Sequence, residues 1–575
     1  MKLEEQIKGK ARKTLRGIPA SAGIAIGNAF VIRQEIFVSK DKIIKKSDIP
    51  YEINRYLNSQ NNLIDELKNA IEKVPQNAFD LLSILQADLM MLEDEIFSNE
   101  IIEHIKKGFS AESSVINQFE KHINLLRRSS DELFRERIIE LDNFEKRFLR
   151  HLSQKEKIVD IPENRIVVAQ RLMPTELVNL LEKNVKAIIT EGGGITSHLA
   201  ILARSYSIPA VFSVNFATNL IVKDDYLIVD AYSGKIYLEP DQELLFDYLD
   251  KSEQIRKYKE KLGKIIDLPA LTQDGKEVTL WANVNSIDDV KQAIVVNAKG
   301  LGLVRTESLV MELGRMPSEE EQFNYYTQIV ETAFPLIVTL RAFDIGSDKY
   351  SENIIEKEDN PALGFRGIRF LLSKKDIFKS QIRAVLRASK NKNVRFMLPM
   401  ITSIEEVVQS NELINICKKE LMQEGIAFDD NMPLGVMIET PAAALISDEL
   451  SQISDFFSIG TNDLTQYILA ADRTNELLSN YFNNFHPGVL RLMEFTINTA
   501  HQNNIPVAVC GEMAGHPLAT ELLLGMGVDE LSMAPSLLLE VKEKILNLNY
   551  NDSREIALKI MKSAKVKDIY QSISY

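Results

Sequence analysis

Apolar residues recur at helical spacing between residues 51 and 150, and only Pro75 and Gly108 interrupt this stretch. One apolar stripe consists of Ile53, Leu57, Ile64, Leu67, Ile71 and Val74. Side chains at these spacings share one face of a helix, so the pattern predicts a bundle of helices. Ser129–Glu132 has the spacing of a capping box, which predicts that a further helix begins there.

Strand patterns lie on both sides of the helical stretch. Residues 17–34 combine Gly and Ala with β-branched residues, which predicts a short pair of strands or a turn followed by a strand. Later apolar runs predict strands at residues 165–172, 185–190, 208–213 and 226–238. The last run contains a Ser233-Gly234 turn, which indicates a hairpin. We therefore expect an α/β region that a helical insertion divides, followed by a charged linker helix at residues 241–265.

Beyond residue 275, short apolar strands alternate with helical patterns. Seven strands are predicted at residues 278–284, 300–307, 336–344, 395–400, 434–440, 456–463 and 507–512. A short eighth strand is expected near Leu363–Arg366. Eight strand–helix units over about 300 residues have the size and rhythm of a (β/α)₈ barrel. A doubly wound open sheet is the structural alternative.

Composition narrows the class of protein. A chain of 575 residues is too long for one hydrophobic core, so about three domains are expected. The net charge of −14 argues against nucleic-acid binding, and no apolar run approaches the roughly 18 residues of a membrane-spanning helix. Residues 1–16 carry six Lys or Arg and two Glu but no apolar core, so a signal peptide is not expected. Two cysteines predict no disulfide framework and fit a reducing cytosol.

A glycine-rich segment supplies the first candidate site. A predicted strand runs into Gly192-Gly193-Gly194, and Thr196-Ser197-His198 then opens a helix. Glycines permit close backbone approach, and a helix start offers free N–H groups, so this arrangement suits a phosphate. His198 is then a metal ligand, a core residue or a phosphoryl acceptor. The glycines favour an anion, and the absence of a nearby second His or Cys argues against a metal.

Charged residues follow several predicted strands of the second half. Arg305, Arg341 and Arg473 stand at or after strand ends, which would bring them to the face where barrel active sites form. Guanidinium groups bind phosphate and carboxylate equally well. Glu439 and Asp463 close two successive strands and indicate a hard divalent cation. The alternative is that these two carboxylates only form ion pairs with the arginines.

The two cysteines differ in their positions. Cys417 lies on a helical pattern and is expected to be a buried packing residue. Cys510 ends the predicted strand VAVC and precedes a glycine turn. Burial is again the ordinary expectation, but at the carboxyl end of a strand a chemical role becomes plausible.

Several motifs, in order along the chain, resemble enzyme I of the phosphoenolpyruvate-dependent sugar phosphotransferase system. They are GIPASAGIAIG, GGGITSHLAILAR, GLGLVRTESLVM, RAFDIGSDK, NPALGFRGIRF, GVMIETPAA, FFSIGTNDLTQYILAADR and VAVCGEMAG. The resemblance covers about residues 17–570. It implies a multidomain α/β fold, in which a swivelling phosphohistidine domain with an inserted helical bundle precedes a C-terminal (β/α)₈ barrel.

The resemblance also implies a division of the chain. The expected parts are a basic extension at 1–16, a phosphohistidine domain at 17–35 plus 149–240, an inserted helical subdomain at 36–148, a linker helix at 241–265, and a barrel at 266–575. The helical subdomain is expected to dock a small histidine-containing phosphocarrier protein. The barrel is expected to bind phosphoenolpyruvate and to form a homodimer. The enzyme is expected to be cytoplasmic, without nucleic-acid binding or membrane insertion.

Residue roles follow from the same resemblance. His198 corresponds to the phosphohistidine, and Cys510 to the proton donor. The positions that correspond to substrate contacts are Arg305, Arg341, Arg473 and Asn462, with Arg366 and Glu512 as accessory positions. Glu439 and Asp463 correspond to Mg²⁺ ligands. The implied reaction moves the phosphoryl group of phosphoenolpyruvate to His198, releases pyruvate, and then phosphorylates the carrier. It is the first step of sugar transport or of a regulatory variant.

Three positions depart from the family pattern. Leu199 stands where Thr usually follows the phosphorylated His, and Glu191 stands where Asp usually precedes the glycines. Asp88 occupies a position of the helical subdomain that commonly holds His, and we expect it to add a negative charge to the partner surface. The first two departures leave the acceptor intact but alter the hydrogen bonding expected around it.

Two alternative functions stay open from the sequence. Pyruvate phosphate dikinase and phosphoenolpyruvate synthase share the phosphohistidine and barrel domains but add a large ATP-binding domain. Only about 190 residues precede His198 here, and about a hundred of them are expected to be a helical insertion without a glycine-rich nucleotide loop. A regulatory phosphorelay protein without turnover is the second alternative, against which the full set of catalytic positions argues.

Overall fold

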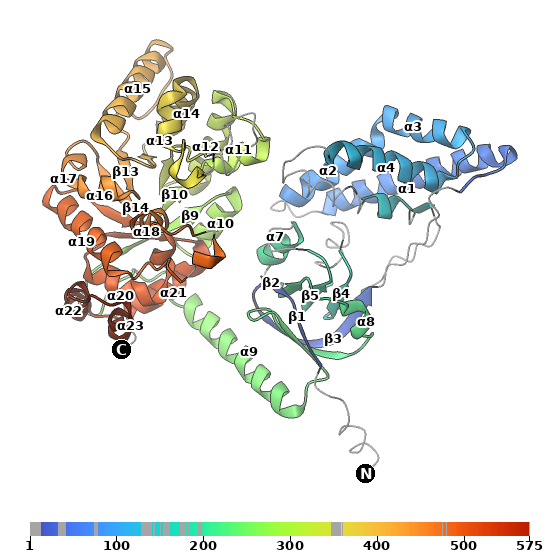
Figure 1. Ribbon diagram of the computed structural model, residues 1–575, viewed down its shortest axis with the longest axis horizontal. Coiled ribbons are helices and arrows are strands. Elements are labelled where there is room, and N and C mark those ends of the chain that lie inside the picture. The colour runs from blue at the N-terminus through green and yellow to red at the C-terminus, as the bar shows by residue number, and fades with distance from the viewer. Residues whose placement is uncertain are drawn as a thin grey trace. The chain divides into compact units, whose positions relative to one another are not determined.

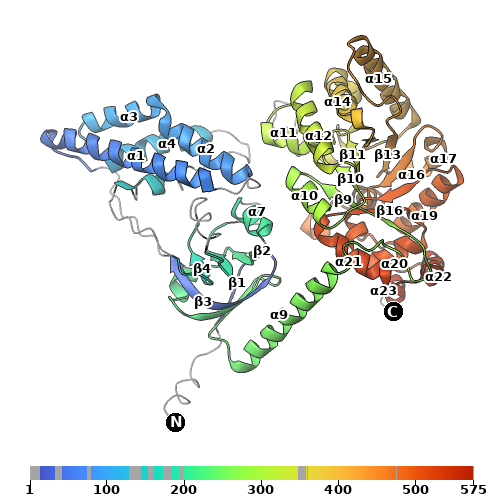
Figure 2. The same cartoon turned by 180° about the vertical axis from the view of Figure 1, so that it is seen from behind.

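The computed structural model forms two compact units, residues 1–257 and residues 258–575. Figures 1 and 2 show both units from opposite sides. The structure describes residues 13–32, 42–73, 79–127, 141, 144–149, 151–152, 161–172, 180, 183–193, 198–206, 208–346, 358, 360–473, 475–478 and 480–573. The basic extension lies outside these residues up to residue 12. No helix in the described part of the chain is both long and apolar enough to cross a membrane.

A mixed eight-stranded sheet forms the centre of the first unit, with strand order β1-β8-β7-β3-β4-β5-β6-β2. Its strands are β1 (Lys13–Arg16), β2 (Ile18–Ser21), β3 (Ile24–Ile32), β4 (Ile166–Ala169), β5 (Ala187–Thr190), β6 (Ala210–Phe212), β7 (Tyr226–Asp230) and β8 (Lys235–Leu238). Strands β3 to β6 run parallel, and the outer pairs are antiparallel. Every residue of β4 and β5 is buried and most are apolar, as parallel strands covered on both faces require.

The hairpin predicted at residues 226–238 is confirmed. Strands β7 and β8 pair antiparallel with Asp230 opposite Lys235, and Gly234 adopts a φ of +69° in the turn. Strands β2 and β3 both form as expected but do not pair with each other. Instead β2 pairs with β6, whereas β3 lies between β7 and β4.

The predicted helical insertion is confirmed over its described residues. It contains α1 (Ile49–Lys73), α2 (Phe79–Glu93), α3 (Glu95–Lys106) and α4 (Ala111–Arg127). The buried face of α1 is turned slightly about the helix axis from the face that the sequence predicted. Tyr56, Leu63 and Leu67 are fully buried, whereas Leu57 is 37% exposed. Val74 and the predicted capping box at Ser129–Glu132 lie outside the described residues.

The expected linker forms helix α9 (Gln242–Gly263), and each of its halves contacts a different unit. In the first unit, the Tyr248 hydroxyl donates to Asp230 Oδ2 at 2.9 Å, and Lys251 Nζ lies 3.6 Å from the same atom. In the second unit, Lys261 Nζ lies 2.6 Å from Glu543 Oε1. Further helices of the first unit are α7 (His198–Ser205) and α8 (Ala217–Leu220), and residues 144–149 are also helical.

The second unit is a closed barrel of parallel strands, so the doubly wound alternative is excluded. Its strands are β9 (Thr279–Val284), β10 (Gly300–Val304), β11 (Ile337–Arg341), β12 (Val394–Leu398), β13 (Leu434–Ile438), β14 (Phe456–Ile459), β15 (Val507–Val509) and β16 (Glu530–Met533). The eighth strand expected near Leu363–Arg366 was wrong. That segment contains the short 3-10 helix Pro361–Leu363, and β16 closes the barrel by pairing with β9 and β15.

Helices surround the barrel and cover its outer face (Figure 1). They are α10 (Ile287–Val295), α11 (Glu307–Leu313), α12 (Glu319–Ala333), α13 (Ile368–Ser373), α14 (Lys375–Ala388), α15 (Ile404–Gln423), α16 (Pro441–Leu445), α17 (Ser447–Leu450), α18 (Thr461–Leu469), α19 (Pro487–Gln502), α20 (Pro517–Gly525), α21 (Pro535–Leu546), α22 (Tyr550–Met561) and α23 (Val566–Ile573). Short 3-10 helices occur at Ser389–Asn391, Glu476–Leu478 and Glu512–Gly515.

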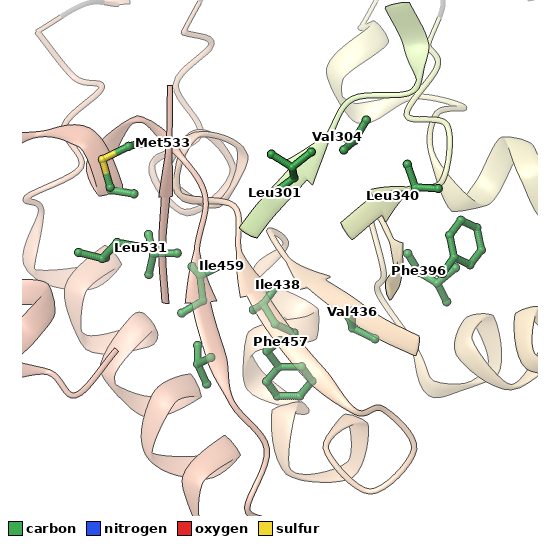
Figure 3. Close-up of a cluster of buried hydrophobic side chains, with 14 of the residues drawn as sticks. Leu301, Val304, Leu340, Phe396, Val436, Ile438, Phe457, Ile459, Leu531 and Met533 are labelled. Carbon is green, nitrogen blue, oxygen red and sulfur yellow. The ribbon is translucent and has the colours of Figure 1, made fainter. Parts of the chain in front are cut away.

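Alternate residues of the barrel strands belong to two separate apolar clusters. Figure 3 shows members of the large core, among them Phe396, Val436 and Phe457. Their neighbours in sequence belong to a small second cluster of Leu303, Met397, Met437, Phe456 and Cys510. Since successive side chains of a strand point to opposite faces, the small cluster fills the inside of the barrel. Cys510 is therefore held at a fixed place inside the barrel.

Candidate active site

The carboxyl ends of the barrel strands carry the charged residues that the sequence singled out. Arg305 directly follows β10, Arg341 ends β11, Glu439 follows β13, and Cys510 follows β15. Asn462 and Asp463 lie in the first turn of α18, just beyond β14. Parallel strands end at one rim of a barrel, so these side chains share its mouth. The remaining barrel positions are Arg366 before α13, Arg473 after α18, and Glu512 at the start of a 3-10 helix.

Arg341 is buried and held by two carboxylates. Its Nη2 donates to Glu307 Oε1 at 2.9 Å, and its Nη1 lies 3.6 Å from Asp344 Oδ2. Burial alone would lower the pKa of Arg341, but the nearby carboxylates, with Glu307 and Asp344 foremost, raise it well above its ordinary value. The guanidinium is therefore permanently charged and fixed in direction.

Arg366 is buried in the same way, and Asp344 is its main partner. The Nε and Nη2 atoms of Arg366 donate to the two oxygens of Asp344 at 3.0 and 2.5 Å. This fork fixes the plane of the guanidinium. The third nitrogen, Nη1, lies 3.8 Å from Asp463 Oδ1, so Arg366 connects the arginine group to a predicted metal ligand.

Arg305 and Arg473 are exposed and, within the described residues, neither has an ion-pair partner. Desolvation at the barrel mouth lowers the pKa of Arg305, although its side chain reaches solvent, and the charges of Arg341 and Arg473 lower it further. The charge of Glu307 offsets part of this effect. Guanidinium groups that repel one another, two of them without an ion pair among the described residues, favour a bound anion. These two arginines are the cations of the mouth that are available to a ligand.

Glu439 and Asp463 form a buried pair of carboxylates. Glu439 is 1% exposed, and its Oε1 accepts from the Met400 amide at 2.6 Å. Burial raises the pKa of Glu439, and the charges of Asp463 and Asp344 raise it further. Asp463 Oδ1 is buried without a hydrogen-bond partner among the described residues. Two repelling carboxylates with an unsatisfied buried oxygen fit a divalent cation.

The size of this carboxylate set also fits Mg²⁺. Within the part of the chain that the structure describes, no three His, Cys, Asp or Glu side chains form a complete metal cage. Mg²⁺ is usually bound by one or two carboxylates together with water and substrate phosphate, so an incomplete protein cage is what it requires. A Cβ atom at Gly460 would lie 3.0 Å from Glu439 Oε2, so the glycine gives Glu439 its space.

Asn462 and Glu512 are joined by two reciprocal hydrogen bonds. Asn462 Nδ2 donates to Glu512 Oε1 at 3.1 Å, and the Glu512 amide donates to Asn462 Oδ1 at 3.0 Å. The pair links the exits of β14 and β15. Each end of the Asn462 amide makes one of these bonds, which leaves one N–H and one lone pair for a substrate.

Cys510 is 3% exposed, and its thiol lies 3.6 Å from the Ile459 carbonyl oxygen, which it faces as a donor. Burial raises the pKa of the Cys510 thiol to about 11, which the hydrogen bond with Ser458 only partly offsets. The thiol therefore stays protonated at neutral pH, as a general acid requires. Cys417 is buried on α15, as expected.

His198 is the first residue of α7, in the first unit. The chain approaches it through Gly193, whose φ of +109° excludes most side chains, while residues 194–197 lie outside the described residues. Glu191 accepts from the Thr218 amide and hydroxyl at 2.8 and 2.6 Å, so this departure from the family pattern binds the start of α8. Leu199 is half-buried against the core of the unit.

Asp88 does not present a charge to solvent. It lies on α2 and is only 7% exposed. The expectation that it adds a negative charge to a partner surface was therefore wrong. The expectation rested on the family's usual His at this position, and such a correspondence does not say whether the side chain is exposed.

A hollow of about 530 Å³ opens elsewhere on the first unit and contains none of the predicted site residues. It lies between β1 and β8, and its lining includes Arg16, Lys235 and Tyr237. The barrel mouth therefore remains the place where candidate chemistry gathers.

Sequence reasoning missed two carboxylates of the barrel mouth. Glu307 and Asp344 are 5% and 2% exposed, and they hold Arg341 and Arg366. Each stands two or three residues beyond an arginine that was singled out, in the strings RTE and RAFD. The rule that drew attention to the arginines, a charged residue after a strand end, would have found both carboxylates.

Comparisons with known proteins agree along the whole chain. Three family models match: "PEP-utilising enzyme, N-terminal" at residues 16–137, "PEP-utilising enzyme, mobile domain" at 161–234, and "PEP-utilising enzyme, PEP-binding domain" at 259–550. A phosphoenolpyruvate-protein phosphotransferase of Haemophilus influenzae is 37% identical over 97% of this chain and 98% of its own length. One of Bacillus subtilis is 35% identical over 96% and 98%, respectively.

Solved structures include a partial match. A solution structure of an Enzyme I (nEIt) protein is 28% identical and covers 42% of this chain and 99% of its own, with a TM-score of 0.38.

Proposed function

The chain belongs to the family of phosphoenolpyruvate-protein phosphotransferases, and from this premise we propose that it transfers the phosphoryl group of phosphoenolpyruvate to His198 and releases pyruvate. The barrel mouth is the proposed substrate site. The observation that carries the proposal is that one rim holds two arginines without an ion-pair partner among the described residues, together with two buried carboxylates. One of these, Asp463, has an oxygen without a hydrogen-bond partner among the same residues. A substrate with both a phosphate and a carboxylate matches this arrangement.

Arg305 and Arg473 bind the anionic groups of the substrate, since neither has to break an ion pair within the described residues first. Arg341 adds a fixed charge, and Arg366 keeps the nearby carboxylate Asp463 in place. Glu439 and Asp463 would hold Mg²⁺, which when bound supplies a Lewis acid that neutralises charge on the substrate oxygens. Asn462 and Glu512 hold the adjoining loops together.

His198 reacts as a neutral imidazole, because only an unprotonated ring nitrogen has a free electron pair. A bond forms between this nitrogen and phosphorus while the bond from phosphorus to the enolate oxygen breaks. The enolate then takes a proton on its methylene carbon to become pyruvate. We assign the proton to the Cys510 thiol, which is protonated at neutral pH and regains its proton from solvent.

The finer biological assignments are also part of the proposal. We infer that His198 passes its phosphoryl group to a histidine of a small phosphocarrier protein that docks on the helical insertion, as the first step of sugar transport or a regulatory relay. The barrel forms the homodimer. Cys417 and Cys510 are both free and buried, which fits work in the reducing cytoplasm.

Incubation of the full chain with labelled phosphoenolpyruvate and Mg²⁺ tests the proposed function. The chain should take up one acid-labile phosphoryl group, and His198→Ala should take up none. His501→Ala serves as the matched control, because His501 belongs to the second unit and contacts Asp529 there. Label from ATP instead of phosphoenolpyruvate, or label retained by His198→Ala, would contradict the assignment.

A further inference from the structure

Glu307 joins the arginines of the barrel mouth through a single oxygen atom. Its Oε1 accepts from Arg341 Nη2 at 2.9 Å and from the Asp344 amide at 2.6 Å. Glu307 is the first residue of α11 and is 5% exposed. One buried carboxylate therefore fixes both a guanidinium and the backbone that carries the next carboxylate.

Asp344 extends this arrangement to the second buried arginine. Its side chain is 2% exposed and holds Arg366 through the fork of two hydrogen bonds. Because the Asp344 amide is bound by Glu307, a shift of Glu307 would displace Asp344 and with it Arg366. The order of dependence runs from Glu307 to Arg341 directly, and to Arg366 through Asp344.

A buried polar layer below Glu307 keeps this part of the barrel rigid. The Thr306 hydroxyl donates to the Arg341 carbonyl oxygen at 2.8 Å. Gln381 is fully buried, accepts from the Phe343 amide at 3.0 Å, and donates to Thr306 Oγ1 at 3.2 Å. The residues that precede Glu307 and Asp344 are thus joined through Gln381, which supports the position from which Glu307 holds Arg341.

We propose that Glu307 is a positioning residue for phosphoenolpyruvate, one that sets the direction of Arg341 and, through Asp344, of Arg366 without contacting the substrate itself. This inference rests on the proposed function. The inference implies that the position of Glu307 Oε1 matters more for substrate binding than the negative charge of the carboxylate. Glu307→Asp keeps the charge but is too short to reach both donors, whereas Glu307→Gln keeps an oxygen at the right reach.

Glu530 offers a matched control in the same barrel. It begins β16 and pairs with Arg395 of β12 at 3.2 Å, with an exposed fraction of 12% for its side chain. Glu530 thus lies at the amino ends of the strands, away from the mouth. Residues at that end of a barrel contribute to stability. Glu530→Gln removes the carboxylate of the ion pair with Arg395 and leaves the proposed substrate site unchanged.

The test measures label uptake by the full chain over a range of phosphoenolpyruvate concentrations. Glu307→Asp should raise the half-saturating concentration by about 10–100-fold, the usual cost of losing a supporting contact, and Glu307→Gln should raise it by roughly threefold to tenfold. Glu530→Gln should lower thermal stability, followed by circular dichroism, yet leave this concentration unchanged.

Each other result overturns the inference. If Glu307→Asp binds as the wild type does while Glu307→Gln is impaired, charge alone is required and the positioning role fails. An equal effect of Glu530→Gln would mean a general loosening of the barrel. Glu307→Gln is nearly isosteric, so if the aspartate variant does not fold, an unchanged half-saturating concentration in the glutamine variant overturns the inference. Absence of label on the wild-type chain would instead overturn the proposed function.

Discussion

At the scale of single residues, the barrel mouth divides its charges into two sets. Arg341 and Arg366 are buried and matched by Glu307 and Asp344. Arg305, by contrast, is without such a partner among the described residues, as is Arg473. A buried arginine requires a carboxylate to compensate for lost hydration, whereas an exposed one does not. The first set therefore gives the mouth its shape, and the second gives it affinity for anions.

Replacement of Cys510 tests the proton donor. Cys510→Ala should slow pyruvate formation by about 10²–10⁴-fold, because loss of one general acid typically has an effect of this size. Phosphoenolpyruvate binding, measured by calorimetry, should change little. Cys417→Ala is the matched control, since Cys417 is equally buried but lies on α15. A Cys510→Ala enzyme as fast as the control would make Cys510 a packing residue and leave the proton to water.

The buried carboxylate pair gives a prediction in which activity and stability change in opposite directions. Glu439→Gln and Asp463→Asn should each abolish label uptake, even in excess Mg²⁺. Without metal, Glu439→Gln should raise the free energy of unfolding by about 1–2 kcal/mol, because it removes repulsion between buried carboxylates. Thermal denaturation in a chelator measures the second effect. A variant that is inactive and also destabilised without metal would return Glu439 to a structural ion-pair role.

The sequence predicted those site residues that directly follow a strand of the barrel. Charged residues after parallel strands share a rim, so Arg305, Arg341 and Glu439 could be grouped from the sequence. The partners of buried arginines could not be assigned, since pairing depends on side-chain directions inside the barrel. Glu307 and Asp344 obey the same rule and could have been placed at the mouth, but their pairing with Arg341 and Arg366 could not. Asp88 was misplaced because burial of a lone polar residue is decided by tertiary packing.

At the scale of elements, the closing strand β16 is one that the local sequence pattern did not predict. Strand β16 alternates Glu530, Leu531, Ser532 and Met533, so it lacks the continuous apolar run that marked the other strands. Its polar residues are satisfied inside the barrel: Ser532 Oγ donates to Asn283 Oδ1 at 2.6 Å, and Glu530 pairs with Arg395. Only the partner strands make these residues acceptable in a core, and that information is absent from the local sequence.

The helical insertion contains an ion pair with a pH-dependent effect on stability. Glu66 of α1 accepts from Arg147 Nη2 and faces His151 Nε2, both at 2.7 Å. Burial alone would raise the pKa of Glu66, but the His151 hydrogen bond and the Arg147 charge lower it from 4.5 to about 2. Because the folded pKa is the lower one, the stabilisation is present above pH 4.5 and is lost as the pH falls towards 2.

Glu66→Gln should therefore destabilise the helical insertion by about 1 kcal/mol at pH 7, a modest value because the carboxylate is half-exposed. The difference from the wild type should shrink between pH 4.5 and pH 2. Hydrogen exchange of the α1 amides measures both values, with the exposed Glu72→Gln as control. A difference that stays constant with pH would mean that Glu66 acts through packing alone.

At the scale of the whole molecule, the proposed donor and acceptor sites belong to different units. His198 lies in residues 1–257, and the barrel mouth lies in residues 258–575. The chain passes between the units once, inside α9, and each half of this helix is bound to its own unit through Asp230 or Glu543. The proposed transfer therefore requires the two units to bring these sites together, and α9 is the segment that joins the units.

A helix-breaking substitution tests the role of α9. Lys257→Pro lies between the two anchors and should destabilise the helix by about 3 kcal/mol without unfolding either unit. Label uptake should fall by about tenfold, because altered approach of the reacting groups is costly. Lys257→Ala controls for loss of the side chain. Equal rates for both variants would show that α9 serves only as a tether.

The pairing of β9 with β16 limits when the barrel can fold during translation. Thr279 lies opposite Glu530, so the barrel cannot close until β16 has left the ribosome. The sheet of the first unit needs nothing beyond Leu238, the last residue of β8. The acceptor domain can thus fold during translation while the barrel strands wait, unpaired and apolar, for the last of them to emerge. The barrel is accordingly the part of the protein whose apolar strands stay exposed longest during synthesis.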